Sequence, residues 1–106
     1  AGLLVVERLA AHWFKREWCY ARSEIVPAFS ASLVHPREVF GPAIGSSAAS
    51  VVLAHNHPSG EVNPSQNDLE LTRRMVQAGE IMGIEVLDHV IISSKAFLSF
   101  KEMGIL

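Results

Sequence analysis

The sequence has 106 residues and a mass of 11.6 kDa, and 49% of the residues are hydrophobic, which is sufficient for one compact domain. Nine lysines and arginines stand against 11 aspartates and glutamates, so the net charge of −2 gives no reason to expect strong autonomous nucleic-acid binding. The single cysteine, Cys19, excludes an intrachain disulfide and a cysteine-rich zinc ribbon and favours a cytoplasmic location.

The start of the chain combines short apolar runs with scattered charges. The run at 3–6 is far too short to cross a membrane, and no basic segment precedes it as in a secretory signal, so neither is expected. Apolar residues between Val6 and Phe14 fall on one side of a helical wheel, which predicts an amphipathic helix. Residues 24–29 predict a short strand, which Pro27 would confine to the edge of a sheet.

A helix and a buried strand are expected next. Pro36 follows His35 in a first-turn position, where its missing N–H costs nothing, and predicts a helix that runs to about Ser47. Residues 50–55 form a short apolar run rich in β-branched side chains, which predicts a strand buried on both faces. The prolines and asparagines of residues 56–64 are typical of turns.

The most regular helix of the chain begins at Ser65. Apolar residues recur along it every three or four positions, at Leu71, Met75, Ala78 and Met82. Gly83 stands where a left-handed C-cap is expected. Residues 84–92 predict a strand, and residues 97–100 predict a short edge strand. The alternation of helices and strands predicts an α/β domain.

The predicted strand and helix bring potential metal ligands together. His55 and His57 are two positions apart in a strand, so both rings point to the same face. Asp68 follows after a ten-residue turn, on the core-facing side of the helix, where a cation would offset the cost of burying its charge. Two imidazoles and one carboxylate leave the fourth tetrahedral position of a zinc ion for water, as in catalytic sites.

Other interpretations fit the same residues taken singly. Ser65 and Asp68 match an N-terminal capping arrangement of the helix. The two histidines could be hydrogen-bonded loop residues. Asp88 and His89 resemble a metal or triad pair, but neighbours in a strand point to opposite faces, so structural hydrogen bonds are expected for them.

The segment at 53–60, LAHNHPSG, together with Ser65 and Asp68, resembles the signature of the RadC-like branch of the JAB/MPN (JAMM) metallopeptidase family. The resemblance implies that His55, His57 and Asp68 bind Zn²⁺. It also implies that Ser65 helps to stabilise the oxyanion of a tetrahedral intermediate.

The resemblance extends beyond this signature. Similar stretches occur at 34–40, 83–89 and 104–106. The match therefore covers roughly residues 30–106, whereas residues 1–29 diverge from the family. It implies that residues 1–106 form a single JAB/MPN-like, cytidine-deaminase-like domain with a mixed β-sheet flanked by helices.

The family's general base is a glutamate upstream of the signature. Counting back from His35 with a short deletion puts Glu7 nearest to the expected place, with Glu17 and Glu24 as alternatives. The family would place that glutamate on a strand, whereas the periodicity predicts a helix around Glu7. The two predictions exclude each other.

The resemblance implies a zinc-dependent hydrolase in which a metal-activated water attacks an amide or isopeptide carbonyl of a peptide or protein substrate. Two alternatives remain open. One is a catalytically inactive protein-interaction scaffold that retains or has lost the metal. The other, suggested by the association of the RadC name with DNA repair, is an accessory factor in nucleic-acid processing.

Overall fold

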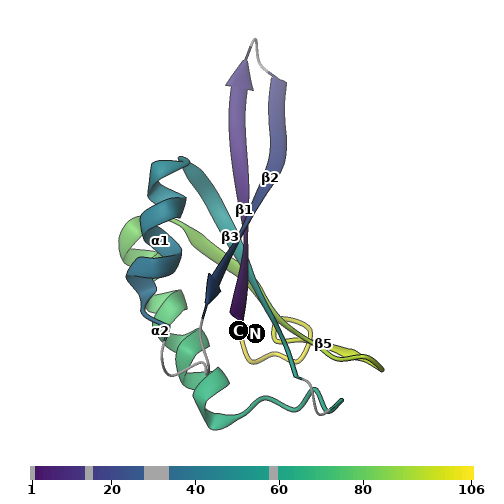
Figure 1. Cartoon of the computed structure of the whole chain (residues 1–106). Coiled ribbons are helices and arrows are strands. Elements are labelled where there is room, and N and C mark those ends of the chain that lie inside the picture. The colour runs from purple at the N-terminus through teal and green to yellow at the C-terminus, as the bar shows by residue number, and fades with distance from the viewer. Residues whose placement is uncertain (1, 14–15, 28–33, 58–59) are drawn as a thin grey trace.

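The computed structural model describes residues 2–13, 16–27, 34–57 and 60–106 (Figure 1). In chain order the elements are β1 (Gly2–Trp13), β2 (Arg16–Pro27), α1 (Pro36–Gly45), β3 (Ala48–Asn56), α2 (Gln66–Met82), β4 (Glu85–Ile92) and β5 (Phe97–Ser99). The five strands form one sheet in the order β2-β1-β3-β4-β5. Only the β3–β4 pair among these is parallel, so the sheet is mixed, as expected for the predicted α/β fold.

The amphipathic helix predicted between Val6 and Phe14 is wrong, because residues 2–13 form strand β1 and Phe14 lies outside the described residues. β1 pairs with β2 on one side and with β3 on the other. Its side chains alternate in burial, with Leu3 and Val5 almost fully enclosed. Hydrogen bonds to two neighbours and burial of alternate residues outweigh the local helical pattern.

The strand predicted at 24–29 is longer than expected, since β2 begins at Arg16 and ends at Pro27. Residues 28 and 29 lie outside the described part of the chain. β2 is an edge strand of the sheet, so the edge position predicted from Pro27 is confirmed.

Both helices lie on the same side of the sheet and contact each other (Figure 1). Helix α1 begins where predicted, because the His35 ring accepts the N–H of Arg37 and the His35 N–H donates to the Glu38 carboxylate. It ends at Gly45, two residues before the predicted end. Phe40 of α1 and Met75 of α2 are buried in the hydrophobic core.

The β3-α2-β4 unit places the end of one strand beside the start of a helix. β3 and β4 run parallel, so α2 must cross back over the sheet between them. The last residues of β3 and the first turn of α2 therefore lie at the same end of the domain (Figure 1). The helix ends at Gly83 with φ 71°, which confirms the predicted left-handed C-cap. No helix in the described part of the chain is long and apolar enough to cross a membrane.

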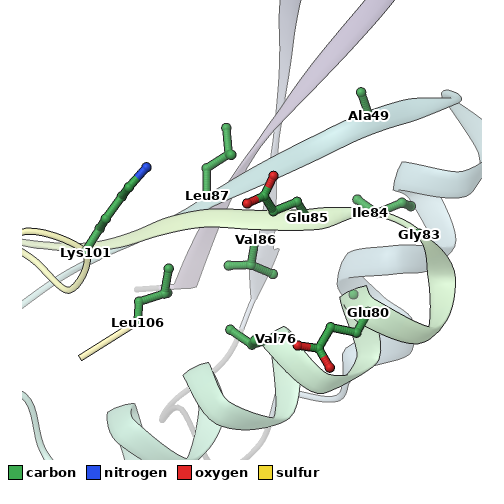
Figure 2. A pocket seen from close by; sticks show the side chains of 11 residues that line it. Ala49, Val76, Glu80, Gly83, Ile84, Glu85, Val86, Leu87, Lys101 and Leu106 are labelled. Atoms are coloured by element: carbon green, nitrogen blue, oxygen red, sulfur yellow. The ribbon is translucent and has the colours of Figure 1, made fainter. Parts of the chain in front are cut away.

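A hollow of about 630 Å³ lies between α2 and β4, toward the carboxyl end of the helix (Figure 2). Glu80, Glu85 and Lys101 surround an otherwise apolar lining. Its lining includes none of the three potential metal ligands singled out from the sequence.

Candidate metal centre

The end of β3 directs two imidazole rings to one point. His55 lies within the strand, and the N–H of His57 donates to the carbonyl of Ile92 at 2.9 Å, which keeps the chain alongside β4 beyond Asn56. The Nε2 atoms of His55 and His57 are 2.9 Å apart, whereas Asn56 between them is exposed. The pairing of the two rings predicted from their spacing is therefore present.

Asp68 reaches both rings from the first turn of α2. One carboxylate oxygen, Oδ1, lies 3.2 Å from Nε2 of His55, and the other, Oδ2, lies 3.2 Å from Nε2 of His57. Asp68 is 4% exposed. The ligand atoms of the three residues lie within 4.8 Å of one another, so a single ion could contact all of them.

Asp68 also caps the helix, as the alternative interpretation expected. The Asp68 N–H donates to Oγ of Ser65 at 3.1 Å, and the Ser65 N–H donates to Oδ2 of Asp68 at 2.8 Å. This capping box and the contacts with the histidines coexist, because each carboxylate oxygen can accept more than one partner. The cap orients the carboxylate toward the histidines.

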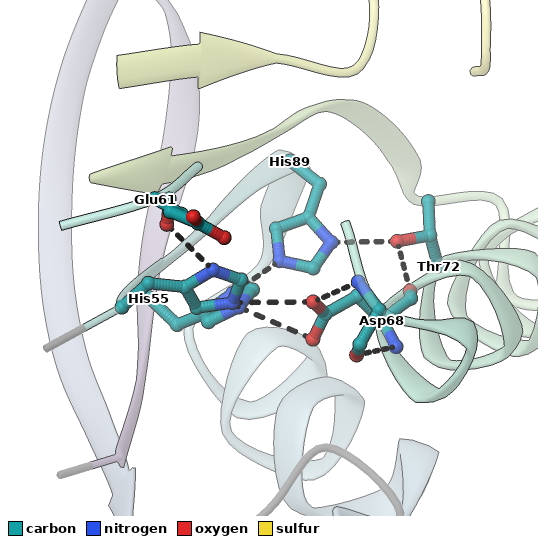
Figure 3. A network of polar contacts seen from close by, with 7 residues as sticks. His55, Glu61, Asp68, Thr72 and His89 are labelled. Carbon is teal, nitrogen blue, oxygen red and sulfur yellow. Dashed lines mark hydrogen bonds and ion pairs between the residues drawn. The ribbon is translucent and has the colours of Figure 1, made fainter. Parts of the chain in front are cut away.

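A second layer of polar atoms contacts the far sides of both rings (Figure 3). Nδ1 of His57 lies 3.1 Å from the carbonyl oxygen of Glu61. Nδ1 of His55 lies 2.8 Å from Nε2 of His89, whose own Nδ1 lies 2.6 Å from Oγ1 of Thr72. The Thr72 hydroxyl donates to the carbonyl oxygen of Asp68 at 2.9 Å.

The electrostatics favour neutral imidazoles beside a charged carboxylate. Burial lowers the pKa of His55, against the opposing attraction of Asp68. Burial, with nearby His55, lowers the pKa of His89 to about 4. Burial alone would raise the pKa of Asp68, but hydrogen bonds from Ser65 and the two histidines outweigh it and lower that pKa. Near pH 7 the site therefore offers nitrogen lone pairs and a negative charge.

His89 and Thr72 are contacts of the site that sequence reasoning did not identify as such. Hydrogen bonding was predicted for Asp88 and His89 on opposite faces, and this is confirmed. Asp88 accepts from the Ser99 hydroxyl and from the N–H of Lys101, whereas His89 is fully buried and faces His55.

Glu7, the nearest candidate for the general base, lies on β1 beside β3. It is 1% exposed and pairs across the sheet with Val51 of β3. His55 follows Val51 by four residues in β3, so the Cα atoms of these two residues are about 13 Å apart, at ~3.3 Å per residue. Glu17 and Glu24 lie on β2, which β1 separates from β3, and their side chains lie outside the described structure.

The chain is similar in sequence to a known family and to proteins of several bacteria. The family model of the RadC-like JAB domain matches residues 21–105. A UPF0758 protein of Rubrobacter xylanophilus is 60% identical over 92 residues, which are 87% of this chain and 40% of that protein. A UPF0758 protein of Symbiobacterium thermophilum is 60% identical over 77 residues, 73% of this chain and 33% of that protein. One of Geobacillus kaustophilus is 49% identical over 90 residues, 85% of this chain and 40% of that protein.

This chain spans between 33% and 40% of the length of these three relatives. The family model covers well over half of the chain, and it includes the residues of β3, α2 and β4 that build the site. The chain belongs to the RadC-like JAB domain family.

Proposed function

We propose that this domain is a zinc-dependent hydrolase for amide or isopeptide bonds of a peptide or protein substrate, with His55, His57 and Asp68 as the metal ligands. One observation carries the proposal: two imidazole nitrogens and a carboxylate meet at one point. Zinc bound in such a three-ligand site supplies a water of pKa about 7 and a polarising charge for a carbonyl group.

The arrangement of acceptors supports a cation at this point. Nδ1 of His57 faces the carbonyl oxygen of Glu61, which can only accept, so this nitrogen bears a hydrogen. When this is the only hydrogen on the ring nitrogens, Nε2 of His57 presents a lone pair to Oδ2 of Asp68 at 3.2 Å. Two acceptors at this distance repel each other unless a proton or a cation lies between them. On the neighbouring His55 ring, the lowered pKa disfavours a second proton near pH 7.

The types of ligand atom favour zinc among common ions. Imidazole nitrogens suit zinc and other transition metals, whereas Ca²⁺ and Mg²⁺ prefer sites built from oxygen atoms. Cysteine thiolates are absent from the described group, which consists of two nitrogens and one carboxylate. Three protein ligands are typical of a catalytic rather than a structural zinc site.

The site is open on the side of the histidines. The side chains of His55 and His57 are 15% and 21% exposed, whereas that of Asp68 is 5% exposed. Water and a substrate carbonyl can therefore reach the rings while the carboxylate stays shielded. Ser65 is exposed beside Asp68, and its hydroxyl keeps a hydrogen to donate after accepting the Asp68 N–H. We assign to this hydroxyl the stabilisation of an oxyanion.

Metal analysis of three proteins tests the ligand set. The wild-type chain and Asn56→Ala, whose exposed side chain lies between the two histidines, should each bind one zinc. His57→Ala should lose most of it, because one of three ligands is missing. Equal zinc content in His57→Ala and the wild type would refute the site.

Hydrolysis needs a separate test, because a scaffold can hold zinc without a general base. Zinc-loaded wild-type protein should cleave a library of peptides and isopeptides, and the variants Glu7→Gln, Glu17→Gln and Glu24→Gln should be compared with it. The base among them should lose turnover at unchanged zinc content. If the wild type cleaves nothing while it binds one zinc, the inactive scaffold replaces the enzyme.

We also propose that residues 1–106 form one RadC-like JAB domain, although the family model matches only residues 21–105, so that the divergence expected for residues 1–29 does not extend to residues 21–29. The position of β1 supports this, since it pairs with β3 from Leu4 to Leu9 and buries Leu3 and Val5 in the same core. Limited proteolysis should release no stable fragment that lacks β1. A stable fragment beginning near residue 30 would contradict the proposal.

A further inference from the structure

We infer that His89 and Thr72 are positioning residues for metal binding, which hold His55 in the tautomer whose Nε2 lone pair points at Asp68. This inference deepens the proposed function and rests on the proposed ligand set. It assigns a role to two buried side chains that lie outside that set (Figure 3).

The direction of the hydrogen bonds begins at the backbone of Asp68. Its carbonyl oxygen can only accept, so the single hydrogen of the Thr72 hydroxyl points to it, over 2.9 Å. We assign the hydroxyl hydrogen to the Asp68 carbonyl, and Oγ1 of Thr72 then has no second hydrogen to give. At 2.6 Å it accepts from Nδ1 of His89, which places the N–H of His89 on that nitrogen.

The same reasoning continues to the metal ligand. A neutral His89 with its hydrogen on Nδ1 has a lone pair on Nε2, which lies 2.8 Å from Nδ1 of His55. Nδ1 of His55 must then be the donor. Its Nε2 is left without a hydrogen at 3.2 Å from Oδ1 of Asp68, as a metal ligand requires.

Packing prevents His89 from turning its ring. The residue is fully buried, its ring stacks on Phe100 with a centroid distance of 4.6 Å, and its carbonyl oxygen accepts the Phe100 N–H at 3.0 Å. The relay starts at Asp68 on α2, passes through β4 and ends at His55 on β3. It therefore links the two elements that carry the ligands.

His57 lacks this kind of support. Its Nδ1 faces the backbone oxygen of Glu61, which is an exposed residue of the loop before α2. The two histidines thus receive the same tautomer from different sources, one buried and one exposed. Substitutions of Thr72 should therefore weaken the hydrogen-bond support of the His55 ring and leave that of the His57 ring unchanged.

Nuclear magnetic resonance of the ring nitrogens in the zinc-loaded chain at pH 8 reads the tautomers directly, because zinc then occupies the point where the Nε2 atoms of His55 and His57 meet. His55, His57 and His89 should all bear their hydrogen on Nδ1. In Thr72→Val, which keeps the shape and removes the hydroxyl, the Nδ1 signal of His89 should shift while that of His57 keeps its wild-type position. A hydrogen on Nε2 of His55 or of His89 in the wild type, or a doubly protonated His89, would overturn the inference.

Zinc affinity supplies the second readout. Thr72→Val should bind zinc about 10- to 100-fold more weakly than the wild type, as is typical when a partner of a metal-binding histidine is lost. Thr72→Ser should restore most of the affinity, because it restores the hydroxyl. Ser50→Ala, which removes a buried hydroxyl from β3, is the matched control and should bind as the wild type does.

The two proposals fail differently. If the wild type binds no zinc, the metal site is refuted, and the positioning role that rests on it is refuted with it. If the wild type binds zinc and Thr72→Val binds it equally well with unchanged tautomers, the ligand set stands and the role of Thr72 and His89 is refuted.

Discussion

Asp68 and His55 are connected twice, once directly and once through two other side chains. The carboxylate Oδ1 of Asp68 lies 3.2 Å from Nε2 of His55, and the carbonyl oxygen of Asp68 leads through Thr72 and His89 to Nδ1 of the same ring. The carboxylate and the backbone of Asp68 therefore reach opposite sides of the His55 ring. Contacts within the protein hold these groups together, so binding of the proposed metal ion would need little rearrangement of them.

Asp68→Asn should separate metal binding from helix capping. An asparagine oxygen can still accept the Ser65 N–H, so the unfolding free energy of the metal-free chain should change by less than about 1 kcal/mol. In the presence of zinc at 1,000 times the dissociation constant, the wild type should gain about 4 kcal/mol. The variant should gain far less at the same zinc concentration. Urea unfolding with and without zinc measures both quantities, and an equal gain in the two proteins would contradict the assignment of Asp68.

Ser65→Ala should show the opposite pattern. It removes the hydroxyl that accepts the Asp68 N–H, and loss of such a cap costs about 1 kcal/mol of stability. The zinc content should remain at one per chain, because Ser65 is not a ligand. Unfolding in urea measures the loss of stability, and metal analysis measures the zinc content. A variant that loses its zinc would show that the cap is needed to place Asp68.

The histidines and Asp68 could be found from the sequence because their geometry is local. Two positions in one strand share a face, and a Ser-x-x-Asp pattern marks the first turn of a helix. The order of strand, turn and helix then fixes which ends meet. Local patterns of this kind gave β3, α2 and β4 close to their observed limits.

His89 could not be placed in this way, because its position depends on a β-bulge. Val51 pairs with Val86, but the register shifts after it, so that His89 pairs with Leu53 and shares a face with His55. Without the shift His89 would pair with Ala54 and point to the opposite face. β1 was missed for a related reason: its two partners lie elsewhere in the sequence, and a helical pattern from Val6 onward was the stronger local signal.

The metal-free chain should lose stability as the pH falls from about 6.5 to 4. The pKa of His89 is lowered to about 4 from an ordinary value of 6.5, so in this window the unfolded chain binds a proton that the folded chain does not. Each pH unit should therefore remove about 1.4 kcal/mol on account of His89. The lowered pKa of His55 acts in the same direction. Urea unfolding in the presence of a chelator, at several pH values, measures the slope.

His89→Phe provides the comparison for this slope. Phenylalanine cannot bind a proton, so the variant should lose stability less steeply over the same pH range, whatever its stability at pH 8. An equal slope in His89→Phe would show that another group causes the acid sensitivity.

Gly79→Ala should destabilise the fold, although alanine is the better helix residue. A methyl group at position 79 would collide with the carbonyl oxygen of Ile84, whose N–H donates to the Gly79 carbonyl at 2.9 Å. This close approach seats the end of α2 against the start of β4. The collision with a backbone atom should cost about 2–3 kcal/mol, which exceeds the ~1 kcal/mol that alanine gains over glycine in a helix.

Gly45→Ala is the matched control, because nothing lies within 4 Å of the added methyl group at the end of α1. Its unfolding free energy should equal or slightly exceed that of the wild type. Thermal and urea unfolding of the metal-free variants compare the two substitutions directly. Since both replace glycine by alanine in a helix, the opposite signs isolate the contact between Gly79 and Ile84. A stabilised Gly79→Ala would mean that α2 can move away from β4 at little cost, and the position of Asp68 at the other end of that helix would then be less firmly held.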